Sequence, residues 1–189
     1  TVIYRLPDLV STAHLAVGTA FFSLLVVLCV RTASAPVVQT ERQTRTLILS
    51  ATAMVYIQMV LGALVRHTES GLACPDIPYC QGEWLKPIAT PAGLHLVHRF
   101  GSIAVLAVVA AVYLACRPLA ALRLWAMAAM GLTVIQIFLG AMSVLTKLTL
   151  WAVMAHLGVA ISMLTCLVVM SARTSTPAPE RPMTVMAEA

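Results

Sequence analysis

Long apolar stretches separated by short polar segments dominate the pattern of this 189-residue chain. The stretches are rich in Leu, Val and Ala without strict alternation, and about 20 apolar helical residues cross a hydrocarbon core of ~30 Å. Because lipid admits only helices or closed barrels, the pattern predicts an all-α fold, a polytopic membrane helix bundle. The five expected transmembrane helices are Leu9–Val30, Thr46–Val65, Gly93–Cys116, Leu124–Leu145 and Leu148–Met170.

Composition supports this interpretation. Hydrophobic residues make up 60% of the chain and charged residues 10%, with a mean hydropathy of +0.93. A water-soluble domain of this length has too few polar residues at such a composition to cover its surface. The net charge of +5 comes from basic residues scattered singly. That distribution argues against nucleic acid as a partner, and the expected surroundings of the chain are membrane lipid.

The basic residues also predict an orientation. Seven would lie on one side of the membrane and five on the other, and cytoplasmic loops carry the excess of Lys and Arg. We therefore expect the N-terminus outside and the C-terminus in the cytoplasm of a bacterial plasma membrane. The start "TVIYRLPD" lacks the basic region of a cleavable signal, so the first helix is expected to remain in the membrane.

The same pattern suggests an organisation into four parts. Residues 1–31 form the first helix, 32–45 an inner polar linker, and 46–172 a four-helix unit with an outer loop over 66–92. Residues 173–189, rich in Pro, Thr and Ser, are expected to be a disordered inner tail.

An internal repeat underlies this division. Residues 11–33 align with 153–175 at nine of 23 identical positions, and His14 falls opposite His156. The second and fourth helices share "IQMVLGA" (57–63) and "IQIFLGA" (135–141). We interpret helices two to five as one unit and helix one as the last helix of a preceding unit. Membrane-protein repeats commonly place ligands at their interfaces.

Two cysteines, Cys74 and Cys80, lie in the outer loop, where an oxidising compartment would let them pair. Their spacing differs from that of a thioredoxin-like or zinc-binding pair, and Pro75 and Pro78 suit a rigid turn. The pattern favours a structural disulfide over a redox-active or metal-binding pair.

All five histidines fall on the outer side of the expected topology. His14, His98 and His156 each lie about five residues into a helix, at a common depth of roughly 7 Å. Ionisable groups at such depth usually face a bundle interior and mark a functional site. The alternative is that these histidines form hydrogen bonds between helices and serve packing alone.

Two imidazoles on facing helices at equal depth are typical ligands of haem iron. Zinc is disfavoured because it takes four ligands and no Asp, Glu or Cys accompanies the histidines in the membrane. Arg99 and Arg66 lie at the outer boundary, where they would either pair with haem propionates or extend to the membrane interface. Gly18, Gly101 and Gly158, near the histidines, would allow either a flat ring or a neighbouring helix to approach.

The motifs "LGALVRHTESGLACPDIPYCQG" (61–82), "HLVHR" (95–99) and "LGAMSVLT" (139–146), followed by "AHL" (155–157), resemble those of the haem A synthase family. The resemblance covers nearly all of the membrane region. It implies a fold of eight helices in two four-helix halves, each with a histidine pair on its second and fourth helices. One half holds haem O, whose methyl group is oxidised to the formyl group of haem A, and the other holds an electron-transferring haem b.

By this resemblance, His98 and His156 are the axial ligands of one half, and His14 is the last-helix ligand of the other, holding a second haem. Cys74 and Cys80 correspond to the family's outer-loop disulfide. His95, three residues before His98 and on nearly the same helix face, is a further candidate for cofactor binding, and the family's substrate half has a Glu at its position. The resemblance therefore implies that helices two to five are the haem b half, and it assigns no catalytic residue.

The function expected from sequence is that of a haem A synthase-like membrane oxidoreductase in cytochrome oxidase assembly, with this chain supplying mainly the cofactor half. Candidate partners are haem O synthase, an electron donor and a second copy of the chain. One rival is a stand-alone bis-histidine b-type cytochrome anchor for electron transfer. Another is a quinone-linked thiol oxidase that uses the loop cysteines, which the lack of a second outer pair disfavours.

Overall fold

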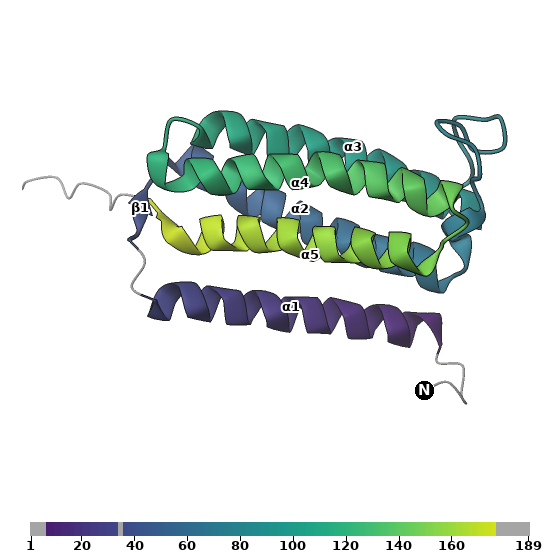
Figure 1. The fold of residues 1–189 in the computed structure, drawn as a ribbon, viewed down its shortest axis with the longest axis horizontal. Coiled ribbons are helices and arrows are strands. Elements are labelled where there is room, and N and C mark those ends of the chain that lie inside the picture. Colours follow the sequence, from purple (N-terminus) through teal and green to yellow (C-terminus); the bar gives the residue numbers. More distant parts are fainter. Residues whose placement is uncertain (1–6, 34–35, 177–189) are drawn as a thin grey trace, which may run out of the picture.

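The computed structural model describes residues 7–33 and 36–176 and contains five long helices (Figure 1). The long helices are α1 (Asp8–Thr32), α2 (Arg42–His67), α3 (Pro91–Cys116), α4 (Ala120–Leu145) and α5 (Leu150–Arg173). The short elements are the strands β1 (Val38–Gln39) and β2 (Thr174–Ser175) and the 3-10 turn η1 (Ser70–Leu72).

Each of the five helices is long and apolar enough to cross a membrane. Many large apolar side chains point away from the bundle, as expected where the surrounding solvent is lipid. On α1 the exposed set comprises Leu9, Val10, Val17, Phe21, Phe22, Leu24, Leu25 and Leu28. The finding confirms the predicted all-α bundle of an integral membrane protein.

Helices α2 to α5 form a ring in which each helix packs against the previous and the next, and α5 closes on α2. Consequently α3 lies diagonally opposite α5, and α2 diagonally opposite α4. Helix α1 flanks this ring by packing on α2 and α5 (Figure 1). The alternating helix directions place the long α2–α3 loop, residues 68–90, at one end. We call this the loop end, and the other the opposite end.

The packed core occupies the half of the ring near the opposite end. Its fully buried members include Ile48, Val55, Val109, Leu122 and Leu167. Near the loop end the helices bury fewer side chains, and four stretches contain no buried side chain. These stretches are residues 56–62 of α2, 97–104 of α3, 134–142 of α4 and 153–159 of α5.

Polar contacts tie the helices together. The Tyr56 hydroxyl of α2 donates to the Ala16 carbonyl of α1 at 2.9 Å, and the Thr52 and Ser171 hydroxyls join α2 to α5 at 2.9 Å. At the opposite end β1 pairs in parallel with β2, which connects the segment before α2 to the end of α5.

The helices extend past the apolar stretches that predicted them. Helix α2 begins at Arg42 and β1 lies at 38–39, both inside the predicted linker 32–45. Residues 173–175 of the predicted tail close α5 and form β2, and 177–189 lie outside the described residues. Hydropathy measures the length in contact with hydrocarbon, whereas backbone hydrogen bonds continue a helix into polar sequence.

The two ends of the bundle carry the basic residues in the grouping expected from sequence. At the opposite end lie Arg31, Arg42, Arg45, Arg117, Arg123 and Arg173; at the loop end lie Arg66, Lys86, Arg99 and Lys147. Arg5 and Arg181 lie outside the described residues.

Gly93 provides a test of how the loop meets α3. A Cβ atom there would overlap the Pro87 carbonyl oxygen, which is backbone and cannot turn aside. We expect Gly93→Ala to lower the free energy of unfolding by about 1–3 kcal/mol, the usual range for overpacking. Thermal unfolding in detergent, followed by circular dichroism, measures it.

Gly131→Ala is the matched control, because no atom lies within 4 Å of a Cβ at that position of α4. Its melting temperature should stay the same or rise, since Ala favours a helix more than Gly does. Equal melting of the two variants would contradict the close approach at Gly93.

Candidate functional site

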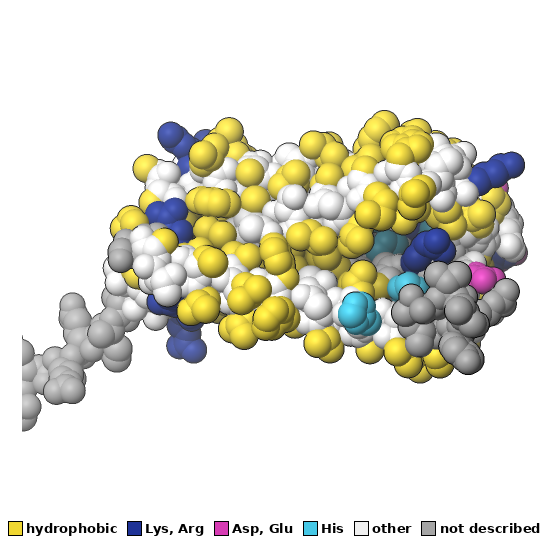
Figure 2. Space-filling view, turned by 60° about the horizontal axis from the view of Figure 1, so that its bottom comes forward, with side chains coloured by type: hydrophobic (Ala, Val, Ile, Leu, Met, Phe, Trp, Pro, Cys, Tyr) yellow, Lys and Arg dark blue, Asp and Glu magenta, His cyan; other side chains and the backbone are white. Residues whose placement is uncertain are grey.

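Histidines gather at the loop end of the bundle (Figure 2). His14, His98 and His156 follow the first residues of α1, α3 and α5 by six, seven and six residues. At about 1.5 Å per residue they lie roughly 9 to 10 Å along their helices, somewhat deeper than expected but at one level. His67 ends α2, and His95 precedes His98 by three residues.

His98 and His156 form the central pair of the site. They come from α3 and α5, which are diagonal in the ring and not side by side. Both are half-buried, and each lies within one of the four stretches that contain no buried side chain. The pair therefore lies in the half of the ring that buries fewer side chains.

Each ring of this pair contacts a glutamine on the preceding helix. Gln58 Nε2 lies 3.1 Å from His98 Nδ1, and Gln136 Nε2 lies 3.2 Å from His156 Nε2. Within the described residues, His156 Nδ1 is buried without a hydrogen-bond partner. Native proteins seldom leave a buried ring nitrogen unpaired unless a ligand or water completes it.

This arrangement fits a haem better than a bare metal ion. Haem iron accepts two axial imidazoles, and the apolar helix surfaces suit the macrocycle. Across residues 7–33 and 36–176, no three or more His, Cys, Asp or Glu side chains come together to hold a metal ion. The two rings differ in their contacts, since His98 is paired through Nδ1 and His156 through Nε2, and the buried unpaired nitrogen of His156 is Nδ1.

The structure does not bring His14 to this pair. Helix α1 lies outside the ring, and the His14 side chain is exposed. In the described part of the chain it takes part in no hydrogen bond. A haem bound at His14 would need a second axial ligand from outside the α2–α5 ring.

His95 supports the loop. Its side chain is only 4% exposed, and its Nδ1 lies 3.1 Å from the Ser70 carbonyl oxygen of η1. Because the hydrogen bond crosses from α3 to the start of the loop, it fixes η1 against the helix. The structure thus engages His95 with the loop and not with the histidine pair, at the position where the family's substrate half has a Glu.

Arg99 is engaged with the same loop. Its Nη1 donates to the Asp76 and Tyr79 carbonyls at 2.7 and 2.9 Å, and its Nη2 donates to the Cys74 carbonyl. One guanidinium therefore satisfies three backbone acceptors of a segment without regular structure. Arg66, at the end of α2, is exposed.

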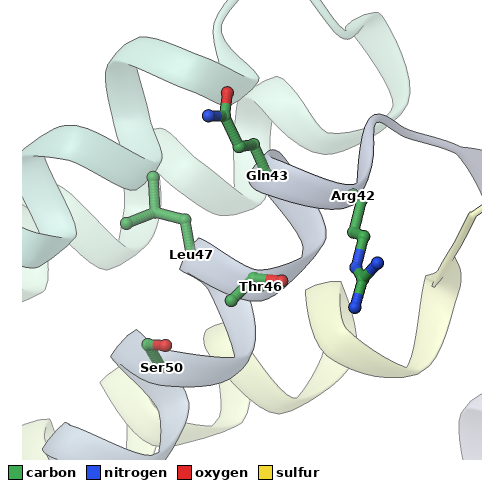
Figure 3. A pocket seen from close by; sticks show the side chains of 5 residues that line it. All are labelled: Arg42, Gln43, Thr46, Leu47 and Ser50. Carbon is green, nitrogen blue, oxygen red and sulfur yellow. The ribbon is translucent and has the colours of Figure 1, made fainter.

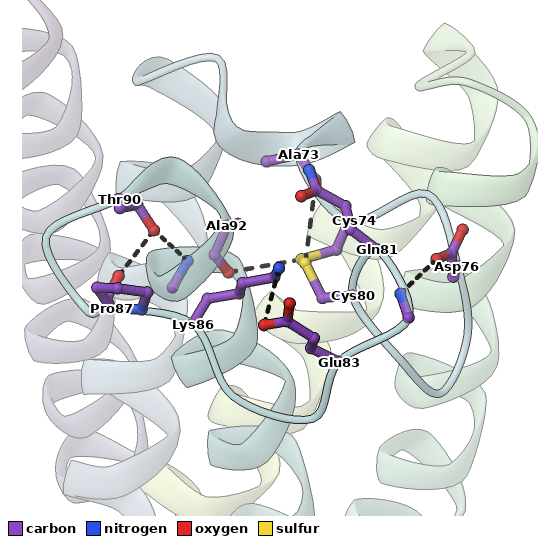
Figure 4. A network of polar contacts seen from close by, with 12 residues as sticks. Ala73, Cys74, Asp76, Cys80, Gln81, Glu83, Lys86, Pro87, Thr90 and Ala92 are labelled. Atoms are coloured by element: carbon purple, nitrogen blue, oxygen red, sulfur yellow. Dashed lines mark hydrogen bonds and ion pairs between the residues drawn. A yellow bond between two sulfur atoms is a disulfide. The ribbon is translucent and has the colours of Figure 1, made fainter.

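The loop has its own polar network (Figure 4). Cys74 and Cys80 are joined as a disulfide, and both are fully buried. Gln81 donates to the Ala73 carbonyl, and the Lys86 ammonium lies 3.0 Å from a Glu83 carboxylate oxygen. The disulfide packs with Leu96 of α3, so the loop is anchored beside the start of the helix that carries His98.

A hollow of about 420 Å³ lies elsewhere, at the opposite end of α2 (Figure 3). Its lining comprises Arg42, Gln43, Thr46, Leu47 and Ser50. It contains no histidine and is lined by less than three turns of one helix. We assign it no part in the site because none of its side chains reaches the histidine pair.

Sequence comparison places the chain among known proteins. Residues 2–168 match the COX15-CtaA family, described as cytochrome oxidase assembly protein. The chain belongs to this family. The match agrees with the resemblance carried by the loop and histidine motifs, and it spans all five helices up to Val168 of α5.

Relatives of this COX15-CtaA chain carry the name "Heme A synthase". The protein of Symbiobacterium thermophilum is 32% identical over 60% of this chain and 38% of its own length. That of Geobacillus kaustophilus is 26% identical over 82% of this chain and 52% of its own. That of Shewanella oneidensis is 26% identical over 89% of this chain and 59% of its own. The chain thus spans about half the length of these relatives.

The glutamines of this COX15-CtaA chain were not predicted from sequence as site residues. The signal was the shared "IQMVLGA" and "IQIFLGA", which contain Gln58 and Gln136. Likewise, Gly18 and Gly158, noted for their closeness to histidines in sequence, have no atom within 4 Å of where a Cβ would lie. The glycines that meet the histidine rings are Gly62 and Gly140, on the other helices.

The role of Arg99 in this family member leads to a prediction. Arg99→Ala removes the donors to three loop carbonyls, and hydrogen bonds to a charged group contribute about 1.5–3 kcal/mol each when buried, less here because the side chain is partly exposed. We expect amide hydrogen exchange across residues 73–83 to accelerate by about tenfold or more, measured by mass spectrometry.

Arg66→Ala serves as the control, since it removes an exposed Arg from the same end of the bundle. Its loop should exchange at the rate of the unaltered chain. If Arg99→Ala exchanged no faster than Arg66→Ala, the guanidinium would not be what holds the loop.

Proposed function

We propose that this chain is the haem b-binding part of a haem A synthase, with His98 and His156 as the two axial ligands. The observation that carries the proposal is their placement at one level on diagonal helices, in the half of the ring that buries fewer side chains. Bound there, the haem would supply one-electron transfer.

The side chains around the pair support this assignment. The helices present apolar walls, and each imidazole is held by a glutamine from a neighbouring helix. Arg66 is exposed at the same end and is the candidate partner of the haem propionates, because Arg99 is engaged with loop carbonyls. The loop, secured by the disulfide and Arg99, packs against the start of α3, the helix that carries His98.

The relatives support a wider activity for the complete protein. Their name, heme A synthase, and their greater length support a complete protein that converts haem O to haem A. In that protein His14 would belong to the second haem site, and Cys74 and Cys80 would be a structural disulfide. We place the loop end outside a bacterial plasma membrane and the opposite end, richer in Arg, in the cytoplasm. Haem O synthase, an electron donor or a second copy are the partners that this role requires.

The alternative, a stand-alone b-type cytochrome anchor, uses the same histidine pair and differs only in having no haem chemistry of its own. No acidic residue lies within α1 to α5 apart from Asp8, the first residue of α1. Measuring haem A formation by the isolated chain and by a longer chain separates the haem A synthase proposal from the cytochrome anchor.

The haem assignment is tested by spectroscopy of the purified chain. We expect low-spin haem b absorbance that is lost in His98→Ala and in His156→Ala, because each removes one axial ligand. His67→Ala, which removes a histidine at the end of α2, should keep the spectrum. An unchanged spectrum in the double variant of His98 and His156 would refute the assignment.

The catalytic proposal predicts that the isolated chain binds haem b without oxidising haem O. Oxidation of a methyl group needs a substrate haem held by partner groups, and His14 is exposed on α1 without them. Chromatography of haems extracted after incubation with haem O and a reductant measures the outcome. A haem A peak that disappears in His14→Ala would contradict this expectation and point to a second copy completing the site.

A further inference from the structure

The two histidines of the central pair are held by the same two-residue arrangement, which occurs once on α2 and once on α4. Gln58 and Gly62 are four residues apart on α2, as are Gln136 and Gly140 on α4. Residues four apart lie one above the other on the same helix face. We call Gln58 with Gly62 the first cradle, and Gln136 with Gly140 the second cradle.

The first cradle holds His98 of α3. Gln58 Nε2 is 3.1 Å from His98 Nδ1 and also donates to the His98 carbonyl at 2.6 Å. A Cβ on Gly62 would lie only 2.9 Å from His98 Cε1. Real Cβ atoms essentially never approach that closely, so any larger residue at 62 would displace the imidazole.

The second cradle holds His156 of α5 in the same way. Gln136 Nε2 is 3.2 Å from His156 Nε2. A Cβ on Gly140 would lie 3.2 Å from His156 Cε1, again closer than ordinary contact. Because α2–α3 and α4–α5 are the two hairpins of the ring, the cradles are related by the same duplication as the sequence motif.

The cradles differ in one respect that bears on their chemistry. The first pairs with Nδ1 of its imidazole and the second with Nε2. A carboxamide carries both a donor and an acceptor, so it can pair with a ring nitrogen in either protonation state. In the second cradle Gln136 Oε1 is buried and unpaired among the described residues, so an acceptor is at hand beside the ring.

We propose that Gln58 and Gly62, and Gln136 and Gly140, are positioning residues for His98 and His156 as haem ligands. The glycines set the plane of each ring by admitting it against the helix backbone. The glutamines hold each ring through a hydrogen bond from the carboxamide nitrogen to one ring nitrogen, Nδ1 of His98 and Nε2 of His156. Outer partners of this kind orient the ring of a ligating imidazole. This inference rests on the proposed haem function.

Substitution of the glutamines tests the inference. Gln58→Leu and Gln136→Leu keep a similar volume and remove the hydrogen bond. Loss of such an outer partner typically weakens metal affinity by about 10- to 100-fold. We expect weaker binding of haem b, with shifted electron paramagnetic resonance g-values and a shifted midpoint potential. Gln43→Leu, near the opposite end of α2, is the matched control and should leave all three unchanged.

The glycines offer a second, independent test. Gly62→Ala and Gly140→Ala should shift the g-values because they turn the ring planes, whereas Gly131→Ala should not. If a Leu variant fails to fold, Gln→Met, which has a similar volume and also lacks the carboxamide donor, takes its place in the same measurements. Unchanged g-values and affinity in the Leu and Ala variants would overturn the inference.

A readout without haem separates this inference from the proposed function. Nitrogen-15 chemical shifts of the histidine rings in the haem-free chain report their tautomers. Those of His98 should change in Gln58→Leu, and those of His156 in Gln136→Leu. Failure of the unaltered chain to bind haem b would overturn the proposed function and the ligand role together. Unchanged shifts beside normal haem binding would overturn the cradles alone.

Discussion

An imidazole inside a membrane bundle must find partners for its nitrogen atoms within the protein, and most of the loop-end structure follows from that constraint. Hydrocarbon supplies no hydrogen bonds, so an unpaired polar group there is costly. The partner of His98 comes from α2 and that of His156 from α4. The requirement pairs α2 with α3 and α4 with α5 at this level. Each imidazole-bearing helix needs a neighbour that carries a glutamine at the same level.

The two halves of the ring have different roles. Near the opposite end, side chains such as Ile48, Val109 and Leu167 pack into a core that keeps the helices in register. Near the loop end the same helices leave the histidines half-buried among partly exposed neighbours. The loop needs its own support, and Arg99 provides it from the residue next to His98.

Sequence alone predicted the helices well, because a continuous apolar run of membrane length has few alternative structures. It also brought His98 and His156 to one level, since depth follows from counting residues along a helix. It did not predict that α3 and α5 are diagonal, because helix order around a ring depends on packing between side chains. Gln58 and Gly62 were missed for a related reason. Their role depends on which helix they face, and a hydropathy pattern contains no such information.

Helices α1 and α5 share the segment Ala-His-Leu, around His14 and His156, yet they place it in different surroundings. His156 lies beside Gln136 in the ring, whereas His14 is exposed on the flanking helix. The chain thus contains its own reference histidine, with the same immediate neighbours in sequence and a different environment in space. Any difference in chemical reactivity between the two imidazoles measures the contribution of the neighbouring helices, free of the effect of local sequence.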